Sequence, residues 1–199
     1  MPVNPDSFRQ ALGRFVTGVT VVTSRYEDEV HGTTMNAFCS VSLNPPLALV
    51  SVDKQADSHD LIAAGGIFAV NILADDQEHL SVTLSQKGTN ELDAAHKLTG
   101  IKYTTRKTGA PILYGIHAFL DCKIINTIDA GDHTIYIGRI EDTGWGEDTL
   151  PLMRRLTVKE LKMMLLTHQT LIPFHRPVYY LIMLLLMLLH ALLAEALFF

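Results

Sequence analysis

The sequence has few of the residues and motifs that mark common catalytic and metal-binding classes. It holds only two cysteines, Cys39 and Cys122, in 199 residues. Their separation fits neither a zinc site nor a disulfide framework, which favours a reducing compartment and predicts a cytoplasmic protein. No Walker loop, G-x-G-x-x-G, G-x-S-x-G or H-E-x-x-H motif occurs. P-loop, Rossmann, α/β-hydrolase and zincin chemistry are therefore unsupported, and no metal site is predicted.

The chain also lacks an excess of positive charge and a secretory leader. Its formal net charge is −5, which gives no electrostatic support for a nucleic-acid partner. Residues 1–6 contain no basic stretch followed by an apolar core, so they do not resemble a signal peptide. With 48% hydrophobic and 19% charged residues, the composition is that of a globular protein, and the length favours one domain.

A ribbon of small polar side chains at 32–46 leads into an apolar strand at 47–52. The ribbon ends at Pro45 and Pro46, which have no backbone N–H to donate to a sheet. Hydroxyl, thiol and amide groups can bind phosphate and ring carbonyls without a formal positive charge. The ribbon residues that carry them include Thr33, Thr34, Asn36, Cys39, Ser40 and Ser42. The residue chemistry alone leaves two interpretations open, a ligand-binding wall or an ordinary solvated hairpin edge.

The hydrophobic pattern predicts a mainly β fold with short helices. Strands are expected at 19–23, 32–42, 47–52, 67–73, 101–105, 116–128 and 133–143. Helices are expected at 6–17, from 58 or 59 to 64, and from 75 or 76 through 84. Phe8, Leu12 and Phe15 are expected to share one face of the first helix. Because only short helices separate the strands, a closed antiparallel barrel is favoured over a doubly wound sheet.

Single histidines are weak signals. His59, His79, His96 and His117 are scattered, and we interpret them as surface or structural residues. His133 differs, because it follows Asp132 where the turn at 129–132 leads into a strand. By itself a histidine at a turn is more often structural than catalytic.

The composition changes after Pro151. Basic residues come first, and residues 178–199 are then apolar except for His190 and Glu195. This atypical, apolar helical tail has the length of a bilayer span and basic residues before it. Two other interpretations are a helix buried in an oligomer and a terminal sequence change of artefactual origin. Membrane contact through 178–199 is an alternative and not the favoured interpretation.

Four segments occur in a familiar order along the chain. They are 8–22, 31–46, 68–73 with Gln77, Leu80 and Ser81, and Gly-Asp-His-Thr-Ile-Tyr-Ile-Gly at 131–138. Together they resemble the flavin reductase family, the small components of two-component flavin-dependent monooxygenases. The resemblance covers residues 5–152 and implies an FMN-binding split β-barrel at 1–152, followed by the tail at 153–199. It also implies a homodimer that uses NADH or NADPH to reduce FAD or FMN for a separate oxygenase, one that acts on an aromatic compound.

The resemblance also implies site residues. Thr33, Thr34, Met35 and Asn36 would lie against the isoalloxazine edge. The ribityl chain and phosphate would be held by Ser40, Val41, Ser42, Ser51, Val52, Asp53, Lys54 and Ser58, and Lys87 completes the cofactor-binding set. His133, the one candidate catalytic residue, would lie near the flavin and the nicotinamide. Direct hydride transfer asks the protein mainly to stack and orient two rings, which suits a chain without an evident nucleophile or metal site.

The chain departs from the family pattern in two places. Leu84 stands where an aromatic residue is usual, and Lys87-Gly88 replaces a Lys-Phe-like pair. The usual aromatic or basic tail is replaced after Leu152. The competing hypothesis is a non-enzymatic flavin- or haem-binding split-barrel protein tethered by its tail. The choice between FAD and FMN, and between NADH and NADPH, is left open by the sequence.

Overall fold

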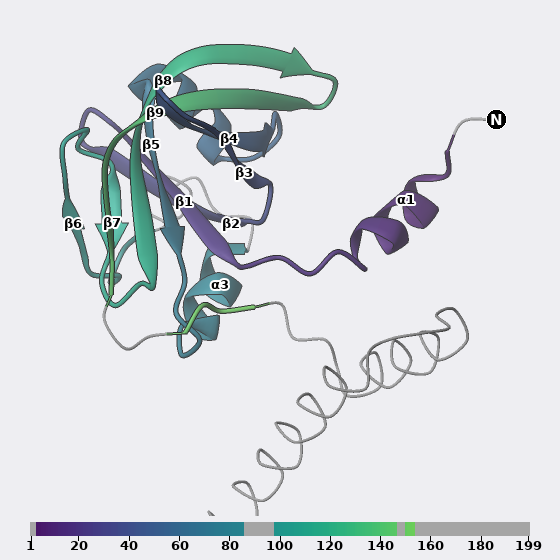
Figure 1. Cartoon of the computed structure of the whole chain (residues 1–199), viewed down its shortest axis with the longest axis horizontal. Helices are drawn as coiled ribbons and strands as arrows, with labels where there is room; N and C mark the ends of the chain where they lie inside the picture. Colours follow the sequence, from purple (N-terminus) through teal and green to yellow (C-terminus); the bar gives the residue numbers. More distant parts are fainter. Residues whose placement is uncertain (1–2, 86–97, 147–149, 154–199) are drawn as a thin grey trace, which may run out of the picture. The chain divides into compact units, whose positions relative to one another are not determined.

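The computed structural model describes residues 3–85, 98–146 and 150–153, which are mainly β (Figure 1). Antiparallel strands form a seven-stranded sheet in the order β2-β1-β5-β8-β9-β4-β3. The strands are β1 (Thr20–Tyr26), β2 (Glu29–Met35), β3 (Phe38–Leu43), β4 (Pro46–Asp53), β5 (Ile67–Ile72), β8 (Ala118–Ala130) and β9 (His133–Trp145). Two short strands pair separately, β6 (Tyr103–Thr105) and β7 (Pro111–Leu113). The helices described are α1 (Pro5–Leu12), α2 (Ser58–Gly65) and α3 (Glu78–Ser85).

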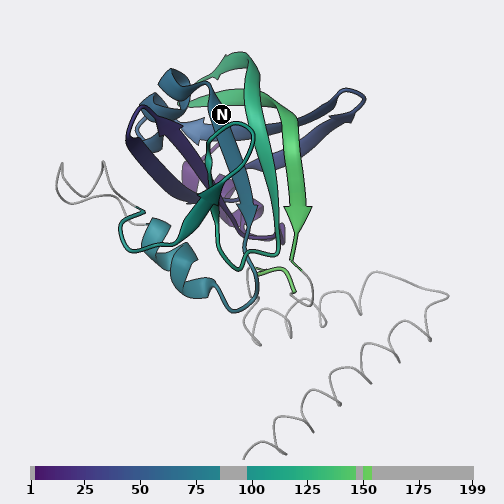
Figure 2. The same ribbon diagram turned by 90° about the vertical axis from the view of Figure 1, so that its left-hand side faces the viewer.

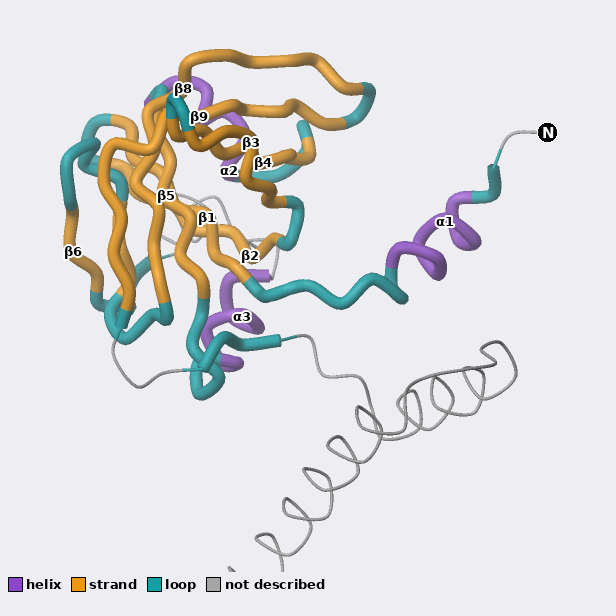
Figure 3. The backbone as a smooth tube through the Cα atoms, viewed as in Figure 1, coloured by secondary structure: helices purple, strands orange, loops and turns teal. Residues whose placement is uncertain are grey.

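The sheet curls into a barrel that is open along one seam. β2 and β3 are consecutive in the chain but lie at opposite ends of the strand order, joined only by Asn36 and Ala37. The Ser51 N–H donates to the Ala37 carbonyl oxygen at 2.9 Å. The connection between β2 and β3 is therefore hydrogen-bonded to β4. Figures 2 and 3 show the sheet wrapping round to bring its two ends near each other. The predicted antiparallel barrel is thus present, although β2 and β3 do not pair within the described residues.

Buried apolar side chains fill the barrel. Val22, Val50, Phe68 and Cys122 are all 0% exposed and belong to one cluster. Burial raises the pKa of the Cys122 thiol from 9.0 to about 12, helped by the charges of nearby carboxylates, so the thiol is neutral at physiological pH. Gly138 lies beside this cluster, and a Cβ there would be 2.7 Å from the Phe68 ring. Because Gly138 has no side chain, the Phe68 ring can pack against the backbone at this position.

The first helix is shorter than predicted. It ends at Leu12 rather than at residue 17, because the Gly13 N–H closes the last turn onto the carbonyls of Arg9 and Ala11. Its apolar residues do not pack on the barrel: Phe8, Leu12 and Phe15 are 55%, 56% and 72% exposed. The apolar spacing indicated a helix correctly, but no surface within the described residues covers it.

The polar ribbon is not one strand. The prediction of a continuous strand at 32–42 is wrong, because the chain leaves β2 at Met35 and starts β3 at Phe38 on the other side of the seam. The third helix also starts later than predicted, at Glu78, and the Gln77 side chain instead accepts a bond from the Ala74 N–H at 3.1 Å. β7 was not predicted, since a three-residue strand carries little periodicity.

The remaining predicted elements are confirmed. The apolar segments 47–52 and 67–73 form β4 and β5, and 133–143 lies within β9. The turn predicted at 129–132 is shorter in the structure, where only Gly131 and Asp132 separate β8 from β9. Gly131 has a φ of 70°. Lys87 and residues 154–199 lie outside the described part of the chain, so their predicted roles stay predictions. Among the described residues, no helix is long and apolar enough to cross a membrane.

Candidate active site

His133 stands at the end of β9, where the β8–β9 turn enters the strand. It is directly opposite Asp53, the last residue of β4. The His133 side chain is 39% exposed, and its Nδ1 lies 2.8 Å from Asp132 Oδ1. This hydrogen bond is the main cause of a lowered pKa for Asp132. One nitrogen of the ring is therefore anchored to a carboxylate, while the ring stays accessible to a ligand from solvent.

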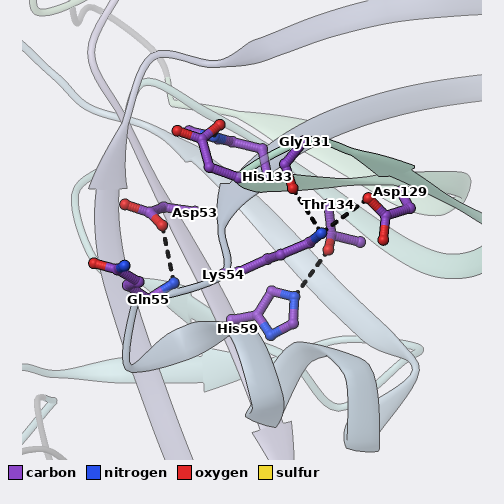
Figure 4. Close-up of polar contacts among 9 residues, drawn as sticks. Asp53, Lys54, Gln55, His59, Asp129, Gly131, His133 and Thr134 are labelled. Carbon is purple, nitrogen blue, oxygen red and sulfur yellow. Dashed lines mark hydrogen bonds and ion pairs between the residues drawn. The ribbon is translucent and has the colours of Figure 1, made fainter.

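Lys54 follows β4 and reaches across to the same turn (Figure 4). Its Nζ donates to Asp129 Oδ1 at 2.9 Å and to the Gly131 carbonyl oxygen at 2.7 Å. The hydrogen bond from Lys54, followed by its positive charge, lowers the pKa of Asp129. The sequence resemblance assigned Lys54 to the flavin phosphate, but in this structure its ammonium group is bound to the protein.

His59 is a neighbour of this site that sequence reasoning missed. Its Nε2 lies 2.9 Å from Thr134 Oγ1, and its Nδ1 lies 2.9 Å from Asp60 Oδ1. We interpreted His59 as a surface or structural residue, and its bonds are indeed structural. They nevertheless hold the residue that follows His133. The signal that could have indicated this is the position of His59 in the first turn of α2, immediately after the β4 loop.

The Thr33–Asn36 segment lies at the seam. Thr34 Oγ1 donates to the Ser81 carbonyl at 2.8 Å, and Thr33 Oγ1 is 3.4 Å from His31 Nδ1. Met35 accepts a bond on its carbonyl from the Thr20 hydroxyl. Asn36 is exposed, with its Nδ2 3.4 Å from Thr17 Oγ1. Thr33 and Thr34 thus have bonds that fix β2, whereas the Asn36 amide is accessible to a ligand.

Ser51 connects this seam to the His133 end of β4. Its backbone bonds to Ala37, and Asp53, opposite His133, is two residues further along the strand. At about 3.3 Å per residue this is a distance of about 7 Å. The structure therefore brings the seam, Ser51, Asp53 and His133 into one region, although they come from distant parts of the chain.

Val52 and Ser58 are less accessible than the sequence suggested. Their side chains are both 1% exposed, so a ligand on the surface can meet only their backbone. Val52 packs in the core. The Ser58 Oγ is buried and has no hydrogen-bond partner among the described residues. As the structure stands, the two side chains do not offer groups to a phosphate.

Ser40, Val41 and Ser42 form an irregular part of β3. Ser40 pairs with Ala48 and Ser42 with Leu47, so a β-bulge leaves one extra residue between them. Without the bulge the two serines would share a face of the strand. With it, Ser40 falls in register with buried Ala48 and Ser42 with half-buried Leu47. Bulges commonly re-aim side chains beside binding sites.

The bulge is far from His133. Leu47, the partner of Ser42, is six residues from Asp53 along β4, about 20 Å at the usual rise per residue. Only an extended ligand, such as a flavin with its phosphate-bearing chain, could contact both ends. Uncharged hydroxyl, amide and backbone groups are present to meet the ring and the chain. With Lys54 engaged elsewhere, a phosphate here would be held by hydroxyl and N–H donors.

Comparisons with known proteins find similar sequences and folds. Residues 12–157 match the flavin reductase like domain model. An NADH-dependent flavin reductase from Rhodococcus sp is 42% identical over 154 residues, which cover 76% of this chain and 82% of the relative. The reductase subunit HsaB of a flavin-dependent monooxygenase from Mycobacterium tuberculosis is 36% identical over 139 residues, covering 70% of this chain and 71% of the relative.

A solved structure shows the same fold. Streptomyces globisporus NADH:FAD oxidoreductase SgcE6, in complex with NAD and FAD fragments, superposes with a TM-score of 0.69 at 31% identity. The match covers 79% of this chain and 98% of that one. The similarity therefore extends over almost the whole of the solved protein.

Proposed function

Because the chain belongs to the flavin reductase family, we propose that it is an NADH-dependent flavin reductase that reduces FAD or FMN and supplies reduced flavin to a separate oxygenase. The observation that carries the proposal is the meeting of the seam, Ser51, Asp53 and His133 at one end of β4 and β9. The names of the relatives support it, since one is an NADH-dependent flavin reductase and another is a reductase subunit of a flavin-dependent monooxygenase.

Each group would have a limited task. When bound, the flavin supplies the acceptor for a hydride from the nicotinamide. The Asn36 amide and the seam backbone would hold the polar edge of the flavin ring, for which they have suitable donors and acceptors. The His133 ring, fixed by Asp132, would orient the nicotinamide without acting as an obligatory acid. The proposed catalysis therefore consists mainly of placing two rings against each other.

The proposal includes a homodimer in the cytoplasm. Apolar side chains are exposed on α1 and just after it, and on the outer part of β8, where Ile125 and Ile128 are 49% and 44% exposed. A second copy of the chain would cover such surfaces, which monomeric proteins rarely leave open. Both cysteines are free thiols, as is usual in a reducing compartment.

The test is oxidation of NADH at 340 nm with added FAD or FMN, comparing the full chain with one that ends at Arg155. The shorter chain keeps Leu152, whose N–H donates to Leu73 at 2.7 Å and whose carbonyl accepts from Val19 at 2.9 Å. It also keeps Met153, which bridges to Gly18. We expect the shorter chain to reduce flavin at a rate within about twofold of the full chain and to elute as a dimer.

Two outcomes would contradict this proposal. A chain that binds flavin or haem but oxidises no NADH would support the non-enzymatic alternative. A shorter chain that precipitates or becomes monomeric would show that residues after 155 belong to the folded core.

The bulge gives a more specific prediction for flavin binding. Ser40 is exposed, whereas Ser42 Oγ accepts from the Asn44 N–H at 3.2 Å within the β3–β4 turn. Replacing both serines by alanine should weaken flavin binding by about 1–3 kcal/mol, the range for two lost hydrogen bonds. Fluorescence titration with FMN measures the change.

Single variants separate a ligand contact from a stability effect. Ser40→Ala should weaken binding without changing the unfolding midpoint, while Ser42→Ala should change both. A matched control is Thr83→Ala on α3, which loses a hydroxyl that bonds within its own helix. Unchanged flavin affinity in the double variant would exclude the bulge from the site.

A further inference from the structure

We propose that Lys54 is a positioning residue that fixes the β8–β9 turn in front of His133, rather than a ligand of the flavin phosphate. This inference rests on the proposed role of His133 at the nicotinamide. It assigns to Lys54 a task that differs from the one its place in the sequence motif suggested.

Three hydrogen bonds join Lys54 to the turn, and Figure 4 shows the two that its Nζ makes. Its Nζ bonds to Asp129 and Gly131 at 2.9 and 2.7 Å, and its backbone N–H donates to the Asp132 carbonyl oxygen at 3.0 Å. The bonded residues span 129–132, the four residues that immediately precede His133. Lys54 therefore contacts the turn along its length, and the last of these bonds is made one residue before His133.

Lys54 already has an ion-pair partner within the protein. Asp129 is its ion-pair partner, and the pKa of Asp129 is lowered by that contact. Two of the three N–H donors of the ammonium group are used by the carboxylate and the Gly131 carbonyl, which hold the group at the turn. The Lys54 and Asp129 side chains are 36% and 78% exposed, so their Coulomb attraction by itself stabilises little. The geometric constraint comes from the two additional bonds to backbone carbonyls.

A second contact holds the other side of His133. His59 bonds to Thr134, the next residue of β9, and the Tyr136 hydroxyl donates to the His59 carbonyl oxygen at 3.4 Å. Lys54 and His59 both belong to the segment by which the chain leaves β4 and enters α2. His133 is thus bracketed, before and after, by side chains from one segment. The position of His133 should depend on that segment even though neither Lys54 nor His59 bonds to the His133 ring.

The experiment is steady-state kinetics and flavin titration of Lys54→Met, with FMN and with riboflavin, which lacks the phosphate. If Lys54 positions His133, the KM for NADH should rise about fivefold with either flavin, as for an interaction of about 1 kcal/mol. The dissociation constants of FMN and riboflavin should both stay within about twofold, since no flavin contact is lost. Lys54→Arg should restore part of the NADH affinity, because a guanidinium can bond to the carboxylate and the carbonyl.

Control variants distinguish a specific effect of Lys54 from a general effect of losing a lysine or of misfolding. Lys123→Met removes a lysine whose side chain has no hydrogen bond or ion pair within the described residues, and it should change neither constant. The effects of Lys54→Met and Asp129→Ala on KM should be non-additive, as expected for contacting partners. Circular dichroism of each variant checks folding, and Lys54→Gln replaces Lys54→Met if the latter does not fold.

Two results would overturn the inference. If Lys54→Met weakens FMN but not riboflavin and leaves the KM for NADH unchanged, Lys54 is a phosphate ligand. If His133→Ala raises the KM and neither Lys54→Met nor Lys54→Gln does, the turn does not need Lys54. If His133→Ala itself has no effect, the proposed role of His133 fails, and that result is distinct from the other two.

Discussion

Replacing His133 by alanine is expected to raise the apparent KM for NADH by about tenfold, the effect of losing one or two well-placed hydrogen bonds to a ligand. The flavin dissociation constant should change by less than about twofold, because the imidazole is proposed to contact the nicotinamide and the bulge proposed to hold the flavin chain is at the opposite end of β4. The kcat should fall less than the KM rises, since hydride transfer itself needs no proton from the protein. Steady-state kinetics with NADH varied, together with flavin titration, measures these quantities.

His79→Ala is the matched control, because His79 is exposed on α3. Equal losses of NADH and flavin affinity in His133→Ala, or no loss of either, would contradict the assignment.

The dependence of KM on pH provides a second check. The pKa of Asp132 is lowered, so its carboxylate is charged above its ordinary value near 3.8 and loses its charge only as the pH falls below that. Titration of Asp132 itself should therefore contribute nothing to the pH dependence of KM between about pH 6 and 8.

Gly65→Ala is expected to destabilise the protein by about 3 kcal/mol, at the upper end of overpacking effects. A Cβ on Gly65 would lie 2.2 Å from the carbonyl oxygen of Arg25 and 3.1 Å from its carbonyl carbon. Because both clashing atoms belong to the backbone of Arg25, neither a rotamer change nor a small side-chain shift can relieve the contact. The end of α2 would have to move away from β1, and His59 is on that helix.

Urea unfolding followed by circular dichroism measures this change, with Ala64→Ser as the control at an exposed neighbour. The control should alter stability by less than about 0.5–1 kcal/mol, as is typical of exposed positions. A Gly65→Ala variant as stable as the control would mean that α2 is not held against β1 as described. A rise in the KM for NADH at temperatures where the variant is folded would further indicate that α2 positions the site.

Local patterns determined much of this fold. The β-branched and apolar runs at 47–52 and 67–73 specify strands by composition alone. The β8–β9 turn requires a positive φ, which Gly131 adopts, and the chain then continues as β9. Gly66 ends α2 in the left-handed conformation, at a φ of 65°. Each of these signals acts between residues a few positions apart, so the sequence expresses it directly.

Long-range pairing decided the rest. Nothing near Met35 shows that the chain must break at Asn36 and cross a seam, because the break depends on how the whole sheet curls. The exposure of Phe8 depends likewise on which surfaces lie beside α1, and its periodicity predicts only the helix.

Asp129 and Thr134, which bond to Lys54 and His59, are each 75 residues away in sequence from these partners. Only the register of β4 against β9 brings them together, and that register is fixed by the buried side chains of both strands. The sequence by itself therefore determined the family, most of the elements and the list of candidate residues. Tertiary structure decided which candidates are accessible, because hydrogen-bond partners and burial depend on contacts between distant segments. Lys54 is bonded to the β8–β9 turn, and Ser58 is buried.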